Sequence, residues 1–87
     1  MAAPAIEMYA TSWCGYCERA RALLRRKAAV FTEISIEGRP DLREQMIQRS
    51  GRRTVPQIFI GARHIGGSDE LAELEQAGEL GPLLSGA

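Results

Sequence analysis

Two cysteines three positions apart are the residues of this chain best suited to covalent chemistry. Cys14 and Cys17 are the only cysteines among 87 residues. A disulfide between them would close a very short loop, which contributes little chain-entropy stabilisation. At a helix start, unpaired backbone N–H groups and the positive end of the helix dipole stabilise a thiolate on the first cysteine. The pair therefore predicts thiol–disulfide exchange, with Cys14 reactive and Cys17, one turn further in, more buried.

Other interpretations of a Cys-x-x-Cys pair fit this sequence less well. A structural zinc site needs four ligands, and the chain offers two cysteines and His64. Covalent haem attachment requires a histidine directly after the second cysteine, where Glu18 stands. Accidental spacing is the remaining alternative, and the position of the pair between an expected strand and an expected helix argues against it.

A second motif, Thr54-Val55-Pro56, precedes an apolar segment. The Val55–Pro56 bond has two interpretations, an ordinary trans bond in a loop or a cis bond. A cis bond would turn the Val55 backbone outward. Its N–H and C=O would then be free to pair with an extended peptide, in the manner of an added strand.

A third motif, Gly66-Gly67-Ser68-Asp69, is expected to begin a helix with Ser68 as its N-cap. The first N–H groups of a helix bind carboxylates. Asp69 could hold an ammonium group beside such a carboxylate. The γ-glutamyl end of glutathione carries both groups, so this segment is a candidate binding site for it.

The elements that must position these motifs can be predicted from periodicity and breakers. In chain order they are a strand over 6–9, a helix over 15–29, a strand over 30–36, a helix that Pro40 begins and Gly51 ends, strands over 57–60 and 63–65 joined by a two-residue turn, a helix from Ser68 to Gly78, and a short terminal turn at 82–84 that packs back. The first two strands should be parallel and the last two an antiparallel hairpin. The order β-α-β-α-β-β-α predicts an α/β protein with one four-stranded mixed sheet flanked by helices.

Individual side chains within these elements can also be assigned. Tyr9, Phe31 and Phe59 are expected in the core, and His64 at the surface.

Composition narrows the class of protein. Eleven basic and eleven acidic residues balance, so neither nucleic acid nor an anionic membrane is an expected partner. No apolar run approaches the ~18 residues of a membrane span. The first five residues lack the features of a signal peptide, so we expect the protein to stay in the cytoplasm. The length of the chain predicts one domain over residues 1–87. Two basic clusters, at 19–27 and 49–53, are either solvated surface or an anion site near the cysteines.

Together, in this order and spacing, the three motifs resemble those of dithiol glutaredoxins. The resemblance covers essentially residues 5–84, and residues 49–60 are very similar to bacterial members of that family. It implies a thioredoxin-like fold and a glutathione-dependent thiol–disulfide oxidoreductase that reduces protein–glutathione mixed disulfides and protein disulfides. The implied partners are glutathione, as co-substrate, and glutathionylated or disulfide-containing proteins, with the protein itself a monomer.

The resemblance also implies roles for individual residues. Cys14 would be the nucleophile and Cys17 the resolving cysteine. The residues implied to contact glutathione are Tyr16, Thr54, Val55 through its backbone, Pro56, Gly67, Ser68 and Asp69.

Two positions depart from the commonest pattern of that family. Gly15 stands where proline is usual, and Thr11 where a lysine often precedes the nucleophile. Without that lysine, one cation that would lower the Cys14 pKa is missing, and the arginines of 49–53 are candidate replacements. Some relatives with glycine or serine at this position bridge a [2Fe–2S] cluster between two protomers. Two Cys14 thiolates and two glutathione thiolates would supply its four sulfur ligands.

The alternative function is therefore a cluster-bridged homodimer that acts as an iron–sulfur carrier or sensor, and no other metal site is expected. Trp13 precedes the motif as in thioredoxins, but those are longer and lack the 66–69 segment. A thioredoxin-type reductant and a catalytically idle interaction module are the further alternatives.

Overall fold

A computed structural model describes residues 3–86 of the chain. That part of the chain forms four strands and four helices. In order they are β1 (Ile6–Ala10), α1 (Gly15–Arg26), β2 (Thr32–Ser35), α2 (Pro40–Ser50), β3 (Gln57–Ile60), β4 (Arg63–Gly66), α3 (Ser68–Gln76) and α4 (Leu80–Ser85).

The strands make one mixed sheet in the order β2-β1-β3-β4. β1 runs parallel to β2 and antiparallel to β3, and β3 and β4 form an antiparallel hairpin. The predicted α/β class, mixed sheet and strand directions are thus confirmed. The predicted element order lacked one element, since the expected terminal turn is a short helix, α4, whose buried Leu80 packs into the core.

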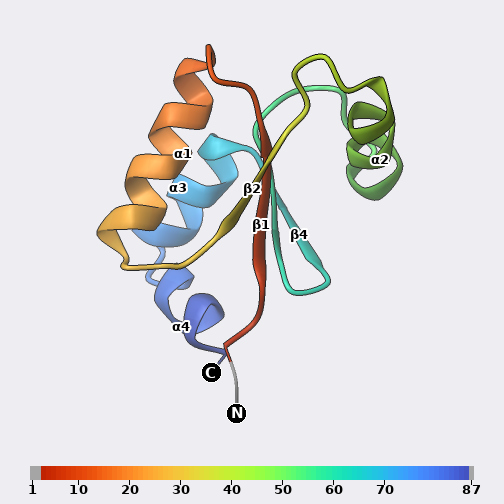
Figure 1. Cartoon of the computed structure of the whole chain (residues 1–87). Helices are drawn as coiled ribbons and strands as arrows, with labels where there is room; N and C mark the ends of the chain where they lie inside the picture. The colour runs from red at the N-terminus through yellow and green to blue at the C-terminus, as the bar shows by residue number, and fades with distance from the viewer. Residues whose placement is uncertain (1–2, 87) are drawn as a thin grey trace.

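Helices cover both faces of the sheet, α1, α3 and α4 on one and α2 on the other (Figure 1). β1 alternates between these two layers, as the period of a strand requires. Ile6 and Met8 join the cluster beneath α1 and α3, and Tyr9 joins Met46 of α2 in the second cluster. The core therefore has two apolar layers that fix the first helix and the third helix against the same face.

Two predicted boundaries are wrong at the turn between α1 and β2. The helix ends at Arg26 rather than at residue 29, because Ala28 takes a left-handed conformation with φ of 56° and reverses the chain. β2 begins at Thr32 rather than Val30, since its first ladder partner is Glu7 near the start of β1. Val30 is 91% exposed.

The expected aromatic core is largely confirmed. Tyr9 and Phe59 are buried and meet edge to face, with ring centroids 6.0 Å apart, and Phe31 is half-buried against the first cluster. The expectation that His64 lies at the surface holds only in part, because the residue is half-buried. Its Nε2 lies 2.7 Å from the Gln57 side-chain oxygen, and its ring packs on Phe59.

Among residues 3–86, none of the helices combines the length and the apolar character that a membrane crossing needs.

Candidate functional site

Cys14 is the N-cap of α1, and both cysteines are reduced thiols. The backbone N–H of Cys17 donates to the Cys14 Sγ over 3.3 Å. The Cys14 thiol in turn donates to the carbonyl oxygen of Val55 over 3.7 Å. Cys14 is half-buried, whereas Cys17 is fully buried in the core. The predicted contrast in burial between the two cysteines is therefore confirmed.

The surroundings shift the two thiol pKa values in opposite directions. Partial burial by itself raises the pKa of Cys14, but hydrogen bonds from the Cys17 side chain and from the backbone of Cys17 and Tyr16, with the charge of Arg21, lower it below the ordinary value. Burial is the largest influence on Cys17 and raises its pKa to about 11. At neutral pH the pair thus offers Cys14 as the nucleophile and keeps Cys17 protonated.

Arg21 is a buried cation behind the two cysteines, although it belongs to a basic cluster that the sequence analysis interpreted as either solvated surface or an anion site. Only 5% of it is exposed. Its Nε and Nη2 donate to the two carboxylate oxygens of Glu33 over 2.6 and 2.7 Å, and Nη2 also donates to the Thr11 carbonyl over 3.0 Å. Glu18 forms a further ion pair with it. The positions 17, 20, 21 and 24 share one helix face, and that spacing could have shown that Arg21 points inward.

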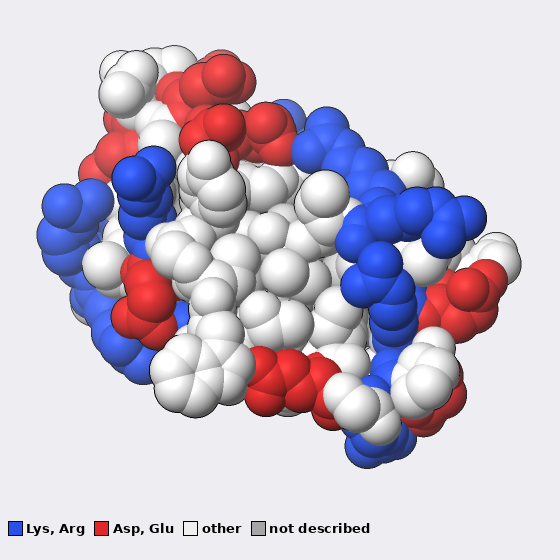
Figure 2. Space-filling view, turned by 90° about the horizontal axis from the view of Figure 1, so that it is seen from above, with Lys and Arg blue, Asp and Glu red and all other residues white. Residues whose placement is uncertain are grey.

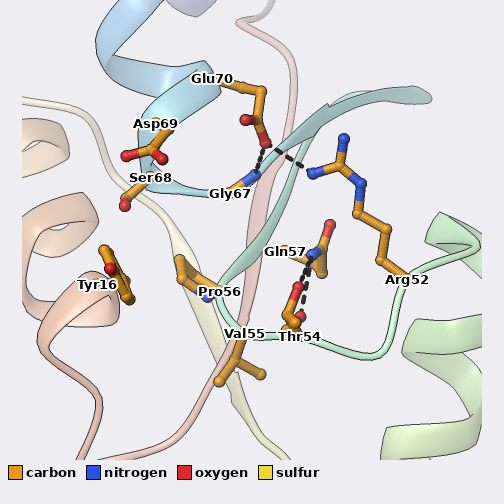
Figure 3. A pocket seen from close by; sticks show the side chains of 10 residues that line it. All are labelled: Tyr16, Arg52, Thr54, Val55, Pro56, Gln57, Gly67, Ser68, Asp69 and Glu70. Atoms are coloured by element: carbon orange, nitrogen blue, oxygen red, sulfur yellow. Dashed lines mark hydrogen bonds and ion pairs between the residues drawn. The ribbon is translucent and has the colours of Figure 1, made fainter.

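A pocket of about 310 Å³ opens between α1, the loop before β3 and the start of α3 (Figure 3). All seven residues predicted to contact glutathione line it. The complete lining is Tyr16, Arg52, Thr54, Val55, Pro56, Gln57, Gly67, Ser68, Asp69 and Glu70. The tertiary structure therefore brings together three motifs that are far apart in the sequence.

The Val55–Pro56 peptide bond is cis, so the trans alternative is wrong. The preceding residue, Thr54, is tied to the strand by Gln57, whose side-chain amide donates to the Thr54 carbonyl and hydroxyl over 3.0 and 3.2 Å. The Val55 carbonyl faces the Cys14 thiol, which places the peptide backbone of this loop beside the reactive sulfur.

The third helix starts one residue earlier than the sequence analysis predicted. Gly67, not Ser68, is the N-cap, and Ser68 is the first helical residue. The cap is made from within the helix, because the Gly67 N–H donates to the Glu70 carboxylate over 2.7 Å. Ser68 is buried and Asp69 is exposed at the pocket. The N-terminus of α3 consequently points its unpaired N–H groups toward the pocket.

The second basic cluster, residues 49–53, divides between two places. Arg49 packs over the Phe59 ring at 4.0 Å and pairs with Glu7 over 3.1 Å, on the α2 side of the sheet. Arg52 lines the pocket and pairs with Glu70 over 2.7 Å. Seen from the end where β1 leads into α1, the molecule has an uncharged centre bordered by basic and acidic side chains (Figure 2).

Within residues 3–86, no group of three or more His, Cys, Asp and Glu side chains is placed to hold a metal ion. The half-buried Cys14 thiol therefore has no cluster of further ligands around it among the described residues.

Comparisons with known proteins agree with this geometry. The sequence model of the family described as Glutaredoxin matches residues 6–65. Glutaredoxin 3 of Escherichia coli K12 is 54% identical over 79 residues, 91% of this chain and 95% of that protein. A glutaredoxin of Pseudomonas aeruginosa is 50% identical over 82 residues, 94% of this chain and 98% of that protein. The crystal structure of a buckwheat glutaredoxin–glutathione complex matches with a TM-score of 0.87 at 32% identity, over 95% of this chain and 78% of that chain. The chain belongs to the glutaredoxin family of thiol–disulfide oxidoreductases.

Proposed function

We propose that this glutaredoxin is glutathione-dependent and reduces protein–glutathione mixed disulfides and protein disulfides. The observation that carries the proposal is that the reactive thiol lies directly beside a pocket suited to a peptide. A thiol of lowered pKa, Cys14, is hydrogen-bonded to the Val55 carbonyl, and Val55 lines a pocket built from the cis-proline loop and the start of α3. A peptide held in that pocket would have its own sulfur next to the Cys14 Sγ.

Three parts of the pocket match groups that glutathione carries. The N-terminus of α3 provides N–H donors for the γ-glutamyl carboxylate, and Asp69 an acceptor for the neighbouring ammonium group. The backbone of Val55 can pair with the cysteinyl residue as an added strand does, and Tyr16 covers it from α1. The glutathione complex of the buckwheat relative supports this assignment.

The proposed reaction consists of two exchanges at sulfur. The Cys14 thiolate attacks the glutathione sulfur of a mixed disulfide, the protein thiolate leaves and takes up a proton, and a Cys14–glutathione disulfide remains. The thiolate of a second glutathione then attacks the sulfur of the bound glutathione. Oxidised glutathione leaves, and the Cys14 thiolate is restored.

Disulfides within proteins follow a variant of this route. The Cys14 thiolate attacks one sulfur of the substrate disulfide, the S–S bond breaks, and the other substrate sulfur leaves as a thiolate that takes up a proton. A mixed disulfide between Cys14 and the substrate remains. The Cys17 thiol then attacks the Cys14 sulfur, its proton passes to the departing substrate thiolate, and a Cys14–Cys17 disulfide results. The pKa of Cys17, raised to about 11, keeps this second thiol from competing at the first step.

We further propose that residues 1–87 act as one glutaredoxin domain, as a monomer in the cytoplasm. The cycle consumes reduced glutathione, which the cytosol maintains at a reducing potential. Met1, Ala2 and Ala87 lie outside the described residues, so the assignment rests on residues 3–86.

Turnover of a small glutathionylated disulfide, coupled to glutathione reductase and NADPH, tests this function. Wild type should turn over, Cys14→Ser should be inactive, and Cys17→Ser should retain activity because a second glutathione replaces the resolving thiol. An inactive wild type would refute glutathione dependence. An inactive Cys17→Ser with an active wild type would refute only the division of roles between the cysteines.

The second candidate function is the cluster-bridged dimer. The favouring observation is that the half-buried Cys14 thiolate has two exposed aromatic neighbours, Trp13 at 94% and Tyr16 at 56% exposure, which a second protomer would cover. A Cβ at Gly15 would meet no atom within 4 Å, so packing does not require this glycine. When bound, the cluster would offer one-electron redox chemistry or cluster delivery, with Cys14 as the protein ligand.

Anaerobic reconstitution with iron, sulfide and glutathione tests this candidate. A cluster-bridged dimer should show visible absorbance and twice the monomer mass, both lost in Cys14→Ser and retained in Cys17→Ser. A colourless monomer after reconstitution would refute it.

A further inference from the structure

An ion pair lies at one end of the pocket. It engages Arg52, the only cationic side chain among the described lining residues. Arg52, in the loop before β3, donates through Nη1 to Glu70 Oε1 of α3 over 2.7 Å (Figure 3). The ten lining residues carry one positive charge, Arg52, and two negative charges, Asp69 and Glu70. Glutathione has two carboxylates and one ammonium group, so it enters with the same sign as the pocket.

Glu70 is held firmly in this position by the start of its own helix. The same Oε1 that pairs with Arg52 accepts the Gly67 N–H over 2.7 Å. A Cβ at Gly66 would collide with the Glu70 carboxylate, so the glycine leaves room for it. The Gly67 N–H and the Arg52 guanidinium lower the pKa of Glu70, and its carboxylate is ionised at neutral pH.

The helix cap does not need the charge of Glu70. A capping side chain at this position only has to present an oxygen acceptor, and glutamine serves as well as glutamate. The negative charge therefore has a separate effect, which is to satisfy Arg52 and to repel anions at this end of the pocket. Both groups are partly exposed, with 48% of the Arg52 and 37% of the Glu70 side chain accessible, so a ligand can reach them.

We propose that Glu70 weakens the binding of glutathione by competing with a glutathione carboxylate for Arg52. This inference rests on the proposed glutathione site. Arg52 holds Glu70 through Nη1 alone, so a bound carboxylate can reach its other N–H donors. That carboxylate must then either displace Glu70 or lie beside the Glu70 carboxylate, which repels it. Holding affinity down in this way favours release of the oxidised product, which carries the same carboxylates.

The size of the effect follows from the exposure of the pair. Partly exposed ion pairs contribute about 0.2 to 1 kcal/mol, which corresponds to a factor of up to about five in affinity. Glu70→Gln keeps the cap and frees Arg52. It should lower the KM for a glutathionylated disulfide, whose glutathione part enters this pocket, about twofold to fivefold with little change in kcat, and Arg52→Gln should raise that KM.

Two readouts test the proposal, the KM for a small glutathionylated disulfide and the calorimetric Kd of S-methylglutathione, which has the same carboxylates as glutathione and cannot exchange. Both should fall in Glu70→Gln. In the Arg52→Gln background the same substitution should have a smaller effect, because no cation is left to free. Glu73→Gln, an exposed carboxylate one turn further along α3, is the matched control for charge removal and should leave both values near wild type.

The outcomes separate this inference from the proposed function. If wild type neither binds S-methylglutathione nor turns over a glutathionylated disulfide, the glutathione site itself is wrong, and the inference falls with it. If wild type binds and turns over but Glu70→Gln matches it, the competition is refuted alone. Strictly additive effects of the Glu70 and Arg52 substitutions would also overturn the inference. So would an equal fall of KM and Kd in Glu73→Gln, because both results would indicate a general effect of charge.

Discussion

Two substitutions that break the same buried ion pair are expected to move the pKa of Cys14 in opposite directions. Arg21→Gln removes the cation behind the cysteines, and Glu33→Gln removes its main counter-charge. The charge of Arg21 lowers the Cys14 pKa, so its loss should raise that pKa. Loss of the Glu33 carboxylate leaves the positive charge less compensated and should lower it.

The two substitutions should differ in their cost to stability. Removing one partner of a buried pair costs about 3 to 5 kcal/mol when the other is left without compensation. In Glu33→Gln the group left behind is Arg21, 5% exposed. The Gln oxygen and Glu18 still compensate part of its charge, so the lower end of that range, about 3 kcal/mol, is the upper bound of the expected cost. In Arg21→Gln the group left behind is Glu33, whose side chain is 33% exposed and therefore hydrated, so the cost should be smaller.

These costs can be measured by thermal unfolding. For a domain of this length, about 3 kcal/mol lowers Tm by roughly 12 to 24 °C, out of a total stability of about 4 to 13 kcal/mol. Alkylation by iodoacetamide as a function of pH, measured in the cold where the variants remain folded, gives the Cys14 pKa. Arg21→Lys retains the charge and should return that pKa toward the wild-type value.

A shift of the same sign in Arg21→Gln and Glu33→Gln would refute the electrostatic reasoning, because loss of packing acts alike in both variants. No rescue by Arg21→Lys would point the same way. In either case, the contact of Arg21 with the Thr11 carbonyl would account for its role, by holding the loop that presents Cys14.

Three further predictions concern the thiols and the core. Alkylation of wild type should modify Cys14 at a pH below the ordinary thiol range and should spare Cys17 until the pH approaches its pKa of about 11. Mass spectrometry of the modified protein measures both, and equal labelling of the two cysteines at neutral pH would contradict the prediction. Met46→Ala should lower the free energy of unfolding by about 2 to 5 kcal/mol in urea titrations, because Met46 of α2 is fully buried in the second core cluster. A change below about 1 kcal/mol would be inconsistent with that packing. Gly66→Ala should lower Tm, since its φ of 119° disfavours a side chain and the added Cβ displaces Glu70 from the Gly67 N–H; an unchanged Tm would contradict this.

Local patterns were sufficient for most of the fold. The alternation of Ile6, Met8 and their neighbours, the Pro40 start and Gly51 end of α2, and the Gly61 turn each depend on a few adjacent residues, and each is found in the structure. The errors lie at element ends, where long-range contacts decide. Val30 continues a strand pattern but lies beyond the start of its partner strand.

The site divides in a similar way. The identity of the reactive thiol could be predicted from the sequence, because a cysteine at the start of a helix has its pKa lowered by groups of the same turn, here the Cys17 side chain and the backbone N–H groups of Cys17 and Tyr16. The full set of residues that line the pocket could be predicted only through the resemblance to a family. Residues around 16, 55 and 68 become neighbours through the sheet, and no local spacing encodes that distance.

The sequence by itself thus determined the chemistry and, apart from the terminal helix α4, the order of elements, since both follow from residue type and short-range periodicity. The tertiary structure alone decided which charges act on the site. Arg21, Arg49 and Arg52 look alike as members of basic clusters, but one is buried behind the cysteines, one stacks on Phe59 beneath α2, and one pairs with Glu70 across the pocket. A guanidinium on a long side chain reaches several angstroms from its backbone, so its partner is set by how elements pack and not by its place in the chain.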